Sequence, residues 1–327
     1  MRKMIIDTDC GSDDAVALMM ALKSRDISVE AITAVGGNVP LDFAVKNALM
    51  TIEVTGGQKP PLFVGAVKPL FRELVTAVNV HGKDGMGDAG LICPTLLPEN
   101  EHAVDAIIRI VKSCPDEIEL VTIGPATNIA LAIMKDPDTM KRVKQIYTMG
   151  TSGFGPGNCT PVSEFNVYVD AEAFHIMITA GIPVTIIGFD LCLGKSALTK
   201  TELDTLMSSG KKEAMFAVTC NRMVVDYNIT ANGQYFLDLP DAVAMGVMLW
   251  DDIVLEKKPC YAYVCLKEEA AYGQVILNDG SKLAIQEGFG GHNPNVEVCT
   301  KIDTDLFKKR LLSLLMTVLI SYGFKST

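Results

Sequence analysis

The first fourteen residues contain four aspartates: Asp7, Asp9, Asp13 and Asp14. They lie between an apolar run at 4–6 and a second apolar run that begins at position 15. This pattern predicts a strand followed by a helix, which places the acids at the carboxyl end of the strand, where open α/β sheets bind ligands. Because like charges repel at this spacing, we predict a divalent cation that prefers oxygen ligands.

N-capping is the structural alternative for these acids. Asp13 or Asp14 could cap the helix expected to begin near Ala15. Capping accounts for one or two of the acids, but not for four acids on both sides of Gly11. We therefore interpret the run as a metal site.

The composition limits the kind of protein. The chain has 327 residues, of which 49% are hydrophobic and 21% are charged, a balance that permits a large core and excludes global disorder. A net charge of −10 argues against nucleic acid as the main partner. Nine cysteines without a CxxC pair and only four histidines argue against a zinc site and are typical of a reducing cytosol.

Two apolar segments bear on membranes and export. The run after Arg2-Lys3 lasts three residues, which is too short for a signal peptide. The run at 311–320 is shorter than the roughly 20 residues of a bilayer span. We expect a cytoplasmic protein without membrane contact, in which residues 311–320 form a buried helix or one packed at a subunit contact.

The first two hundred residues alternate strand and helix patterns. The predicted strands are 3–6, 29–35, 61–64, 118–123, 145–149 and 183–188, and the predicted helices are 13–23, 41–54, 102–113, 128–134 and 171–180. Strands that are apolar throughout and separated by helices indicate an α/β fold with an open, mostly parallel Rossmann-like sheet that has helices on both faces.

The remainder is predicted to be a mostly helical portion followed by a small β-hairpin. The helical portion covers 199–249 with a break around 228–238, the hairpin pairs 254–266 with 272–277, and 296–298 adds a strand. Because no repeat or low-complexity linker marks a boundary, we interpret residues 1–327 as a single domain.

Glycine and asparagine follow several predicted strands. Gly36-Gly37-Asn38, Gly124-Pro125-Ala126-Thr127-Asn128 and a loop at 150–158 that contains Asn158 stand at consecutive strand ends. Glycine allows backbone to approach a ligand closely, and a carbonyl group there can bind a cation. The repetition of this chemistry at one edge predicts a ligand site.

These motifs together resemble the nucleoside hydrolases, the inosine-uridine-preferring family of ribohydrolases. The resemblance rests on Asp7-Thr8-Asp9-x-Gly11-x-Asp13-Asp14-Ala15, Gly37-Asn38, His81-Gly82-x-x-Gly85-x-Gly87, Gly124-Pro125-x-Thr127-Asn128, Met149-Gly150, Asn158, Glu164-Phe165-Asn166 and Pro240-Asp241-Ala242.

The resemblance implies a Ca²⁺ ion that binds the attacking water and the ribose diol. The matching ligands are Asp9, Asp14, Asp241 and the backbone carbonyl of Ile123, and Asp9 is the matching general base. Three carboxylates and a carbonyl, completed by water and sugar hydroxyls, suit the coordination of Ca²⁺.

The resemblance also implies the substrate contacts. The matching positions are Asp13, Asn38, Met149, Asn158, Glu164, Phe165 and Asn166. We expect Glu164 and Asn166 to face the same side of an extended segment because they flank one residue. The implied reaction is hydrolysis of the N-glycosidic bond of ribonucleosides through an oxocarbenium-like transition state, in nucleoside salvage, by a homodimer or homotetramer.

The chain departs from the family pattern where the leaving base is activated. A branch of the family has histidine where this chain has Pro240, and the one tryptophan, Trp250, is expected in the helix after Asp241. His81 is our preferred candidate for this step, with Tyr227 and Tyr235 as aromatic base contacts that flank a second loop at 228–233. Cys10, which stands where proline is common in the family, is a further candidate for this step. Its alternative interpretation is a small buried side chain that fills space.

Two other classes of function remain as alternatives. A haloacid-dehalogenase-type phosphotransferase also begins with Asp-x-Asp after a strand, but Gly11 stands where that family has threonine or valine. It also leaves the later Asn, Glu and Asp motifs unexplained. A non-catalytic Ca²⁺-binding or ribose-binding protein is the other alternative.

Overall fold

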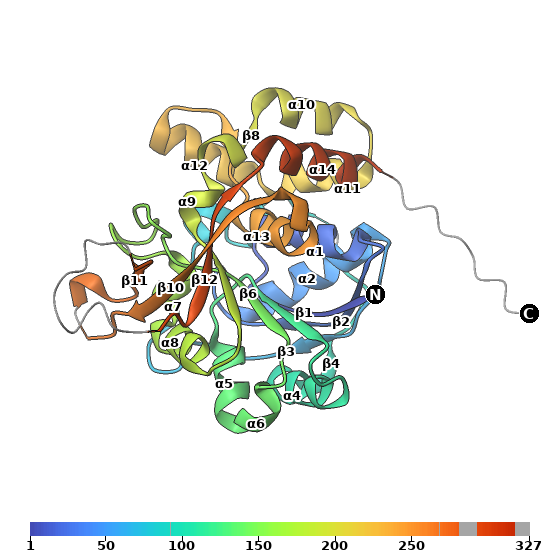
Figure 1. Cartoon of the computed structure of the whole chain (residues 1–327). Helices are drawn as coiled ribbons and strands as arrows, with labels where there is room; N and C mark the ends of the chain where they lie inside the picture. The colour runs from blue at the N-terminus through green and yellow to red at the C-terminus, as the bar shows by residue number, and fades with distance from the viewer. Residues whose placement is uncertain (92, 268, 281–292, 318–327) are drawn as a thin grey trace, which may run out of the picture.

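A ten-stranded sheet forms the centre of the computed structural model, which describes residues 1–91, 93–267, 269–280 and 293–317 (Figure 1). In order across the sheet, the strands are β11 (Val275–Asn278), β10 (Val254–Val264), β12 (Val296–Ile302), β7 (Val184–Ile187), β6 (Gln145–Met149), β5 (Ile118–Thr122), β1 (Arg2–Thr8), β2 (Ile27–Ala34), β3 (Leu62–Val64) and β4 (Glu99–His102). All neighbours from β12 to β4 pair in parallel, whereas β10 pairs antiparallel with both β12 and β11. The predicted open, mostly parallel sheet and the hairpin are confirmed.

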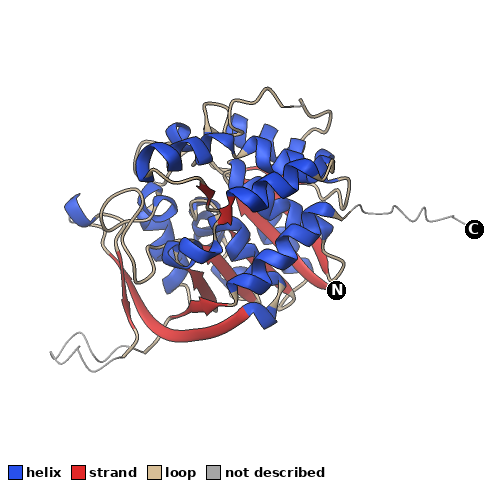
Figure 2. Ribbon diagram, turned by 90° about the horizontal axis from the view of Figure 1, so that it is seen from above, coloured by secondary structure: helices blue, strands red, loops and turns tan. Residues whose placement is uncertain are grey.

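Helices cover both faces of this sheet, as Figures 1 and 2 show. The α-helices are α1 (Ser12–Lys23), α2 (Leu41–Thr55), α3 (Val78–His81), α4 (Ala103–Ser113), α5 (Thr127–Lys135), α6 (Pro137–Met140), α7 (Phe165–Val169), α8 (Ala171–Thr179), α9 (Phe189–Cys192), α10 (Lys200–Ser208), α11 (Lys212–Cys220), α12 (Arg222–Asn232), α13 (Pro240–Leu249) and α14 (Thr304–Met316). A separate two-stranded sheet pairs β8 (Leu198–Thr199) with β9 (Phe236–Leu237). Helices α1, α2, α13 and α14 belong to one apolar core, and α4, α5 and α8 belong to the other.

Strand β1 shows how the sheet separates these two cores. Met4 and Ile6 lie in the core shared with α1 and α13, whereas Ile5 lies in the core shared with α4 and α5, and all three are fully buried. Successive side chains of a strand point to opposite faces, so a strand covered on both sides is apolar throughout. This is the physical origin of the uninterrupted apolar run at the start of the chain.

The strand order reverses direction beside β1. The chain moves outward from β1 through β2, β3 and β4, and then returns to the other side of β1 with β5, β6 and β7. The connections that leave β1 and β5 therefore diverge from the carboxyl edge of two adjacent parallel strands. Such a switch point is where open α/β sheets bind ligands, and Asp9 and Ile123 stand directly after these two strands.

Three predictions about local structure are wrong in part. Strand β4 was not predicted, because its sequence Glu-Asn-Glu-His is polar and lies at an exposed edge. The break predicted at 228–238 is shorter, because α12 continues through residue 232 before an αL glycine, Gly233, ends it. The helix predicted at 311–320 begins at Thr304 and ends at Met316, and residues 318–320 lie outside the described residues.

Among the described residues, no helix is long and apolar enough to cross a membrane.

Asn128, in the first turn of α5, connects the central strands beneath the predicted site. Its side-chain amide donates hydrogen bonds to Asp7 Oδ1 (2.8 Å) and to the carbonyl of Ala34 (3.0 Å), and its Oδ1 accepts one from the N–H of Ala66 (2.8 Å). Asn128 is fully buried. One side chain thus satisfies groups from β1, from β2 and from the chain that follows β3.

We predict that Asn128→Ala lowers the free energy of unfolding by about 2–3 kcal/mol, because it leaves buried polar groups without partners. Urea titration followed by circular dichroism measures the change. Asn100→Ala, at an exposed position of β4, is the control and should change stability by less than about 0.5 kcal/mol. Equal stability of the two variants would show that Asn128 does not connect the strands.

Candidate active site

A cleft of about 790 Å³, partly open to solvent, lies at the carboxyl edge of the sheet. Most residues that the sequence predicted for the site line it: Asp13, Asn38, His81, Ile123, Met149, Asn158, Glu164, Phe165, Asn166, Tyr227 and Asp241. The fold thus brings together residues from across more than two hundred positions of sequence. Asp9 and Asp14 are fully buried next to these residues, and Tyr235 does not line the cleft.

Asp9 is held by two close backbone segments. Its Oδ2 accepts a hydrogen bond from the N–H of Asn38 (2.6 Å), whereas its buried Oδ1 accepts none from the described residues. A Cβ atom at Gly37 would lie 2.1 Å from Oδ2, and one at Gly124 would lie 2.8 Å from Oδ1. Glycine is therefore required after both β2 and β5, because only glycine lets the backbone approach this carboxylate.

Asp14 is fixed by hydrogen bonds to both of its oxygens. Oδ1 accepts from the hydroxyl of Thr8 (2.5 Å), and Oδ2 accepts from the N–H of Gly11 (2.8 Å) and from the Asn38 side chain (3.2 Å). The contact with Gly11, the residue before α1, is a capping interaction, so the capping alternative explains part of the role of Asp14. It does not explain Asp13, whose buried Oδ1 accepts no hydrogen bond within the part of the chain that the structure describes.

Asp241 completes a group of three carboxylates. It lies in the first turn of α13, and one oxygen from each of Asp13, Asp14 and Asp241 lies within 4.8 Å of the others. The first turns of α1 and α13 thus converge on one point, which places two positive helix-dipole ends at the cluster. The geometry groups Asp13 with Asp14 and Asp241, whereas the resemblance assigned Asp9 to the metal and Asp13 to the sugar.

Burial makes this concentration of negative charge costly. Loss of solvent raises the pKa of Asp9 and of Asp241 well above the usual range, and the neighbouring carboxylates raise both further. The same causes raise the pKa of Asp14 to about 6. The three-carboxylate group and the unpartnered oxygens of Asp9 and Asp13 are oxygen donors of the kind a hard divalent cation requires. These residues therefore fit a metal ion.

The Ile123 carbonyl lies at the same edge and is oriented by Asn166. The side-chain amide of Asn166 donates hydrogen bonds to the carbonyl of Ile123 (3.1 Å) and to that of Met149 (3.3 Å). Asn166 thus connects the ends of β5 and β6. A carbonyl has two lone pairs, so this bond leaves Ile123 a second acceptor position.

Glu164 is the N-cap of α7, which corrects the prediction of an extended segment. Its carboxylate accepts hydrogen bonds from the N–H groups of Asn166 (2.9 Å), Val167 (3.2 Å) and Thr151 (3.2 Å). Glu164 and Asn166 share the cleft because a helix begins between them, and not because a strand alternates. Burial raises the pKa of Glu164 to about 7, although the three N–H groups oppose the rise.

The loop before α7 carries backbone strain at the edge of the cleft. Thr151 has a φ of 74°, which is unfavourable for a β-branched residue. Its N–H reaches Glu164, and its carbonyl accepts a hydrogen bond from the N–H of Phe189 (2.9 Å). Asn158, further along the loop, accepts a hydrogen bond from the N–H of Phe165 through Oδ1 (2.9 Å). The strain therefore coincides with a loop that positions cleft residues.

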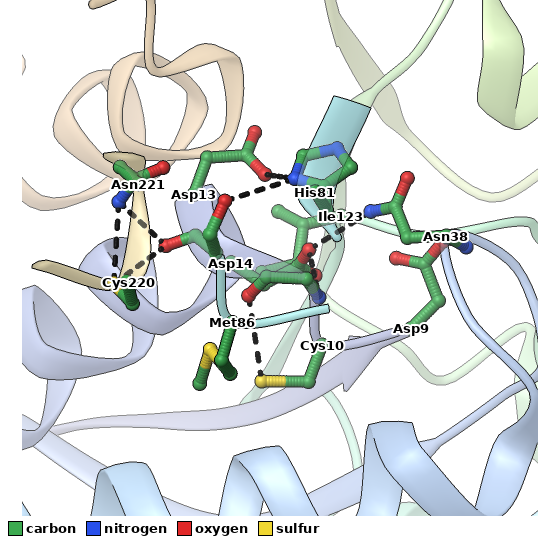
Figure 3. A network of polar contacts seen from close by, with 12 residues as sticks. Asp9, Cys10, Asp13, Asp14, Asn38, His81, Met86, Ile123, Cys220 and Asn221 are labelled. Carbon is green, nitrogen blue, oxygen red and sulfur yellow. Dashed lines mark hydrogen bonds and ion pairs between the residues drawn. The ribbon is translucent and has the colours of Figure 1, made fainter. Parts of the chain in front are cut away.

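His81 ends the short helix α3 and lies beside the acidic cluster (Figure 3). Its Nδ1 lies 2.9 Å from the Ser12 hydroxyl and 3.8 Å from Asp13 Oδ1. With Nδ1 held in this way, the other ring nitrogen, Nε2, forms no hydrogen bond or ion pair with the described residues. The carbonyl of Ser12 in turn accepts from the side chains of Cys220 (3.6 Å) and Asn221 (2.9 Å), which ties the first turn of α1 to the start of α12.

Arg222 holds the chain that follows His81. Its guanidinium donates hydrogen bonds to the carbonyls of Gly87 and Asp88, both at 2.5 Å. The glycines of this segment could be identified from the sequence. Arg222, which is distant in sequence and donates to the carbonyls of Gly87 and Asp88, could not.

Cys10 does not line the cleft. It is fully buried, its sulfur lies 3.9 Å from the carbonyl of Gly11, and burial raises the pKa of its thiol well above the usual range. A thiol that stays protonated in an apolar setting behaves as a small hydrophobic side chain. The contacts favour the interpretation of Cys10 as a buried filler.

The remaining wall of the cleft comes mainly from α12 and from the segment before α13. It contains residues that the sequence did not single out as site residues: Ala77, Val80, Phe189, Val224, Asn228 and Asp238. Pro240 also lines it, whereas Trp250 follows the end of α13 and packs against Phe307, with ring centroids 6.4 Å apart. Tyr227 lies on α12 and not in a loop, and the ring of Tyr235 contacts Lys200.

Comparisons with known proteins point to one family. A family model described as "Inosine-uridine preferring nucleoside hydrolase" matches residues 4–309. The chain is similar to the pyrimidine-specific ribonucleoside hydrolase RihA of Salmonella arizonae, with 40% identity over 188 residues that make up 58% of this chain and 60% of that protein. It is also similar to the probable uridine nucleosidase 1 of Oryza sativa, with 32% identity over 78% of this chain and 79% of that protein.

A solved structure of a nucleoside hydrolase is similar to the fold of this chain. A plant nucleoside hydrolase superposes with a TM-score of 0.91 and 29% identity, over 97% of this chain and 99% of that chain. The chain spans about three fifths of the length of several curated relatives that it matches.

We predict that Ca²⁺ stabilises the protein more at pH 8 than at pH 5. The raised pKa values mean that the metal-free folded state binds more protons than the unfolded chain, so its stability falls as the pH rises from about 4 to about 6. A cation offsets the repulsion only where the carboxylates have lost their protons. At one hundred times the dissociation constant, saturation of the site contributes about 2.7 kcal/mol, or a few degrees in Tm.

Thermal unfolding with Ca²⁺ or with EDTA at the two pH values measures the difference. Asp241→Asn should abolish most of the Ca²⁺ effect, and Asp138→Asn, at an exposed position of α6, should leave it intact. An equal effect of Ca²⁺ in all three proteins would place the cation elsewhere.

Proposed function

The chain belongs to the family of inosine-uridine preferring nucleoside hydrolases, and from this premise we propose that it hydrolyses the N-glycosidic bond of ribonucleosides to free base and ribose. The observation that carries the proposal is the group of buried carboxylates at the switch point, which faces a cleft lined with amide and carboxylate side chains. A cluster of this kind suits the activation of water beside a polyhydroxylated substrate. The phosphotransferase alternative is not favoured, because the family match spans nearly the whole chain.

We propose Ca²⁺ as the cation of this site. Its ligands would be Asp9, Asp14, Asp241 and the carbonyl of Ile123, and Asp13 lies close enough to Asp14 and Asp241 to be a further ligand. Such a cation lowers the pKa of a bound water and fixes its position. Six to eight oxygen ligands suit Ca²⁺, so water and the sugar hydroxyls would complete the set.

Asp9 is the residue that takes the proton of the attacking water. Among the described residues, Oδ1 of Asp9 accepts no hydrogen bond, while its Oδ2 accepts one from the N–H of Asn38. One oxygen is therefore held and the other is available for the proton.

The ribose lies against the polar wall of the cleft in this proposal. Asn38, Asn166 and Glu164 offer directional hydrogen bonds to its hydroxyls. The positive charge that develops on the sugar in an oxocarbenium-like transition state is favoured by the nearby carboxylates Asp9, Asp13 and Glu164. Asp9 and Glu164 accept hydrogen bonds from backbone N–H groups before substrate arrives, and the Asn166 side chain is held by the carbonyls of Ile123 and Met149, so little reorganisation of these groups is needed.

His81 is the proposed donor of a proton to the leaving base. Ser12 and Asp13 contact its Nδ1, which leaves Nε2 for the substrate. Proline at position 240 cannot serve this purpose, although it lines the cleft. Tyr227 lines the cleft as well and is the aromatic contact to the base that we retain.

The reaction is proposed to serve nucleoside salvage in the cytosol. Cys10, Cys192 and Cys220 are buried free thiols, which suits a reducing compartment.

We predict that the protein releases ribose from inosine or uridine in buffer without phosphate, and that Asp9→Ala lowers kcat/KM by about 10²–10⁴-fold, the contribution of a general base. A reducing-sugar assay measures the product. Asp26→Ala, at an exposed turn, should retain normal activity. Release that requires phosphate would indicate a phosphorylase, and an active Asp9→Ala variant would refute the role of Asp9.

We predict that His81→Gln slows natural nucleosides more than it slows p-nitrophenyl riboside. The p-nitrophenolate ion leaves without protonation, so it does not need a proton donor. The comparison of kcat for inosine, uridine and p-nitrophenyl riboside separates this role from a general loss of structure. Equal losses for all three substrates would remove His81 from the leaving-group step.

A further inference from the structure

The wall of the cleft formed by α12 contains a pair of polar residues in contact. Asn228 is 4% exposed, and its side-chain amide donates hydrogen bonds to Asp238 Oδ1 (2.6 Å) and to the carbonyl of Phe236 (3.3 Å). Both partners are acceptors, so the NH₂ group of Asn228 must face them. The amide orientation is thereby settled, and the Asn228 carbonyl oxygen is left as an acceptor.

Asp238 is the charged member of this pair. It lines the cleft three residues before Asp241, and its second oxygen, Oδ2, receives no hydrogen bond from the side chains of the described residues. Loss of solvent raises the pKa of Asp238. Among charged groups, Asp13 raises this pKa further and His81 lowers it. Asn228 and Asp238 thus offer the cleft acceptors only, because a carboxylate and an amide oxygen cannot donate.

Apolar residues also line this cleft. Val80 of α3, Phe189 of α9, Val224 of α12 and Pro240 of α13 line the same cleft. Apolar walls suit the faces of a planar heterocycle, and an isolated acceptor among them suits a polar group on its edge. The sugar-binding candidates come instead from the loop after β2 (Asn38) and from the start of α7 (Glu164 and Asn166), so the two walls of the cleft differ in chemistry.

We infer that Asp238, positioned by Asn228, determines specificity by accepting a hydrogen bond from an N–H group on the edge of the leaving base. This inference rests on the proposed function. It selects bases with such a donor, as in hypoxanthine, guanine and uracil, over bases whose edge has none. A base without a donor leaves a partly buried carboxylate without its partner, which is the strongest basis for rejecting a close analogue.

The test compares substrate pairs that differ at this edge: inosine against purine riboside, and uridine against 2-pyrimidinone riboside. The ratio of kcat/KM within each pair is measured for the wild-type protein and for Asp238→Asn. The variant retains an oxygen for Asn228 but presents an NH₂ group to the cleft. Because the ratio is compared between two proteins, differences in leaving-group ability cancel.

We expect Asp238→Asn to lower the ratio for the preferred substrate pair by about 10–100-fold, the size of one hydrogen bond to a charged acceptor. Asp238→Glu should retain part of the preference, and Asp238→Ala should lose it. Asp226→Asn, the same change at an exposed position of α12, should leave the ratio unchanged. Equal losses of activity on both members of each pair, with the ratio unchanged, would overturn the inference.

Binding of the free bases separates this inference from the proposed function. If the wild-type protein hydrolyses no nucleoside, the proposed function fails, and isothermal titration with hypoxanthine and with purine becomes the measurement. Tighter binding of hypoxanthine that Asp238→Asn abolishes supports the role of Asp238. Equal binding of the two bases, or a preference that survives Asp238→Asn, refutes it.

Discussion

The desolvation of like charges at the end of β1 is the constraint on which the site depends. Asp9, Asp14 and Asp241 are buried together, and their pKa values rise because each loses water and faces the others. Two helix N-termini and a few N–H donors reduce this cost without cancelling it. A divalent cation would offset this cost, and in the proposed function the same burial prepares the carboxylates to bind metal and Asp9 to accept a proton from water.

The surrounding backbone makes this burial possible. Gly37 and Gly124 let the chain pass within contact distance of Asp9, and Asn128 satisfies the polar groups of three neighbouring segments below it. The strained Thr151 donates its N–H to Glu164, which lines the cleft. The carboxylates are thus held by rigid strand ends and helix starts, which suits a site that must be organised before substrate binds.

The two walls of the cleft have different origins. The wall proposed for the sugar comes from strand ends and the helices that follow them, where the parallel sheet gathers polar loops. The wall proposed for the base comes from α12 and the segment before α13, which belong to the helical portion of the chain, together with Val80 of α3 and Phe189 of α9. Because of this division, the wall for the base can differ in chemistry from the wall for the sugar, while the sheet fixes the carboxylate cluster. Asn228 and Asp238 are the polar pair within the otherwise more apolar wall for the base.

The sequence by itself determined the parallel α/β sheet and the position of the acids. Strands that are apolar throughout, such as β1, and the run from Asp7 to Asp14 are local signals. Local patterns could not show that Glu164 caps a helix, that polar β4 joins the sheet edge, or that Asn228 and Asp238 meet. Only the tertiary structure decided these features, since each depends on which distant groups supply a hydrogen-bond partner or exclude water. It also decided the grouping of Asp13 with Asp14 and Asp241, because two helix starts far apart in sequence must converge to form it.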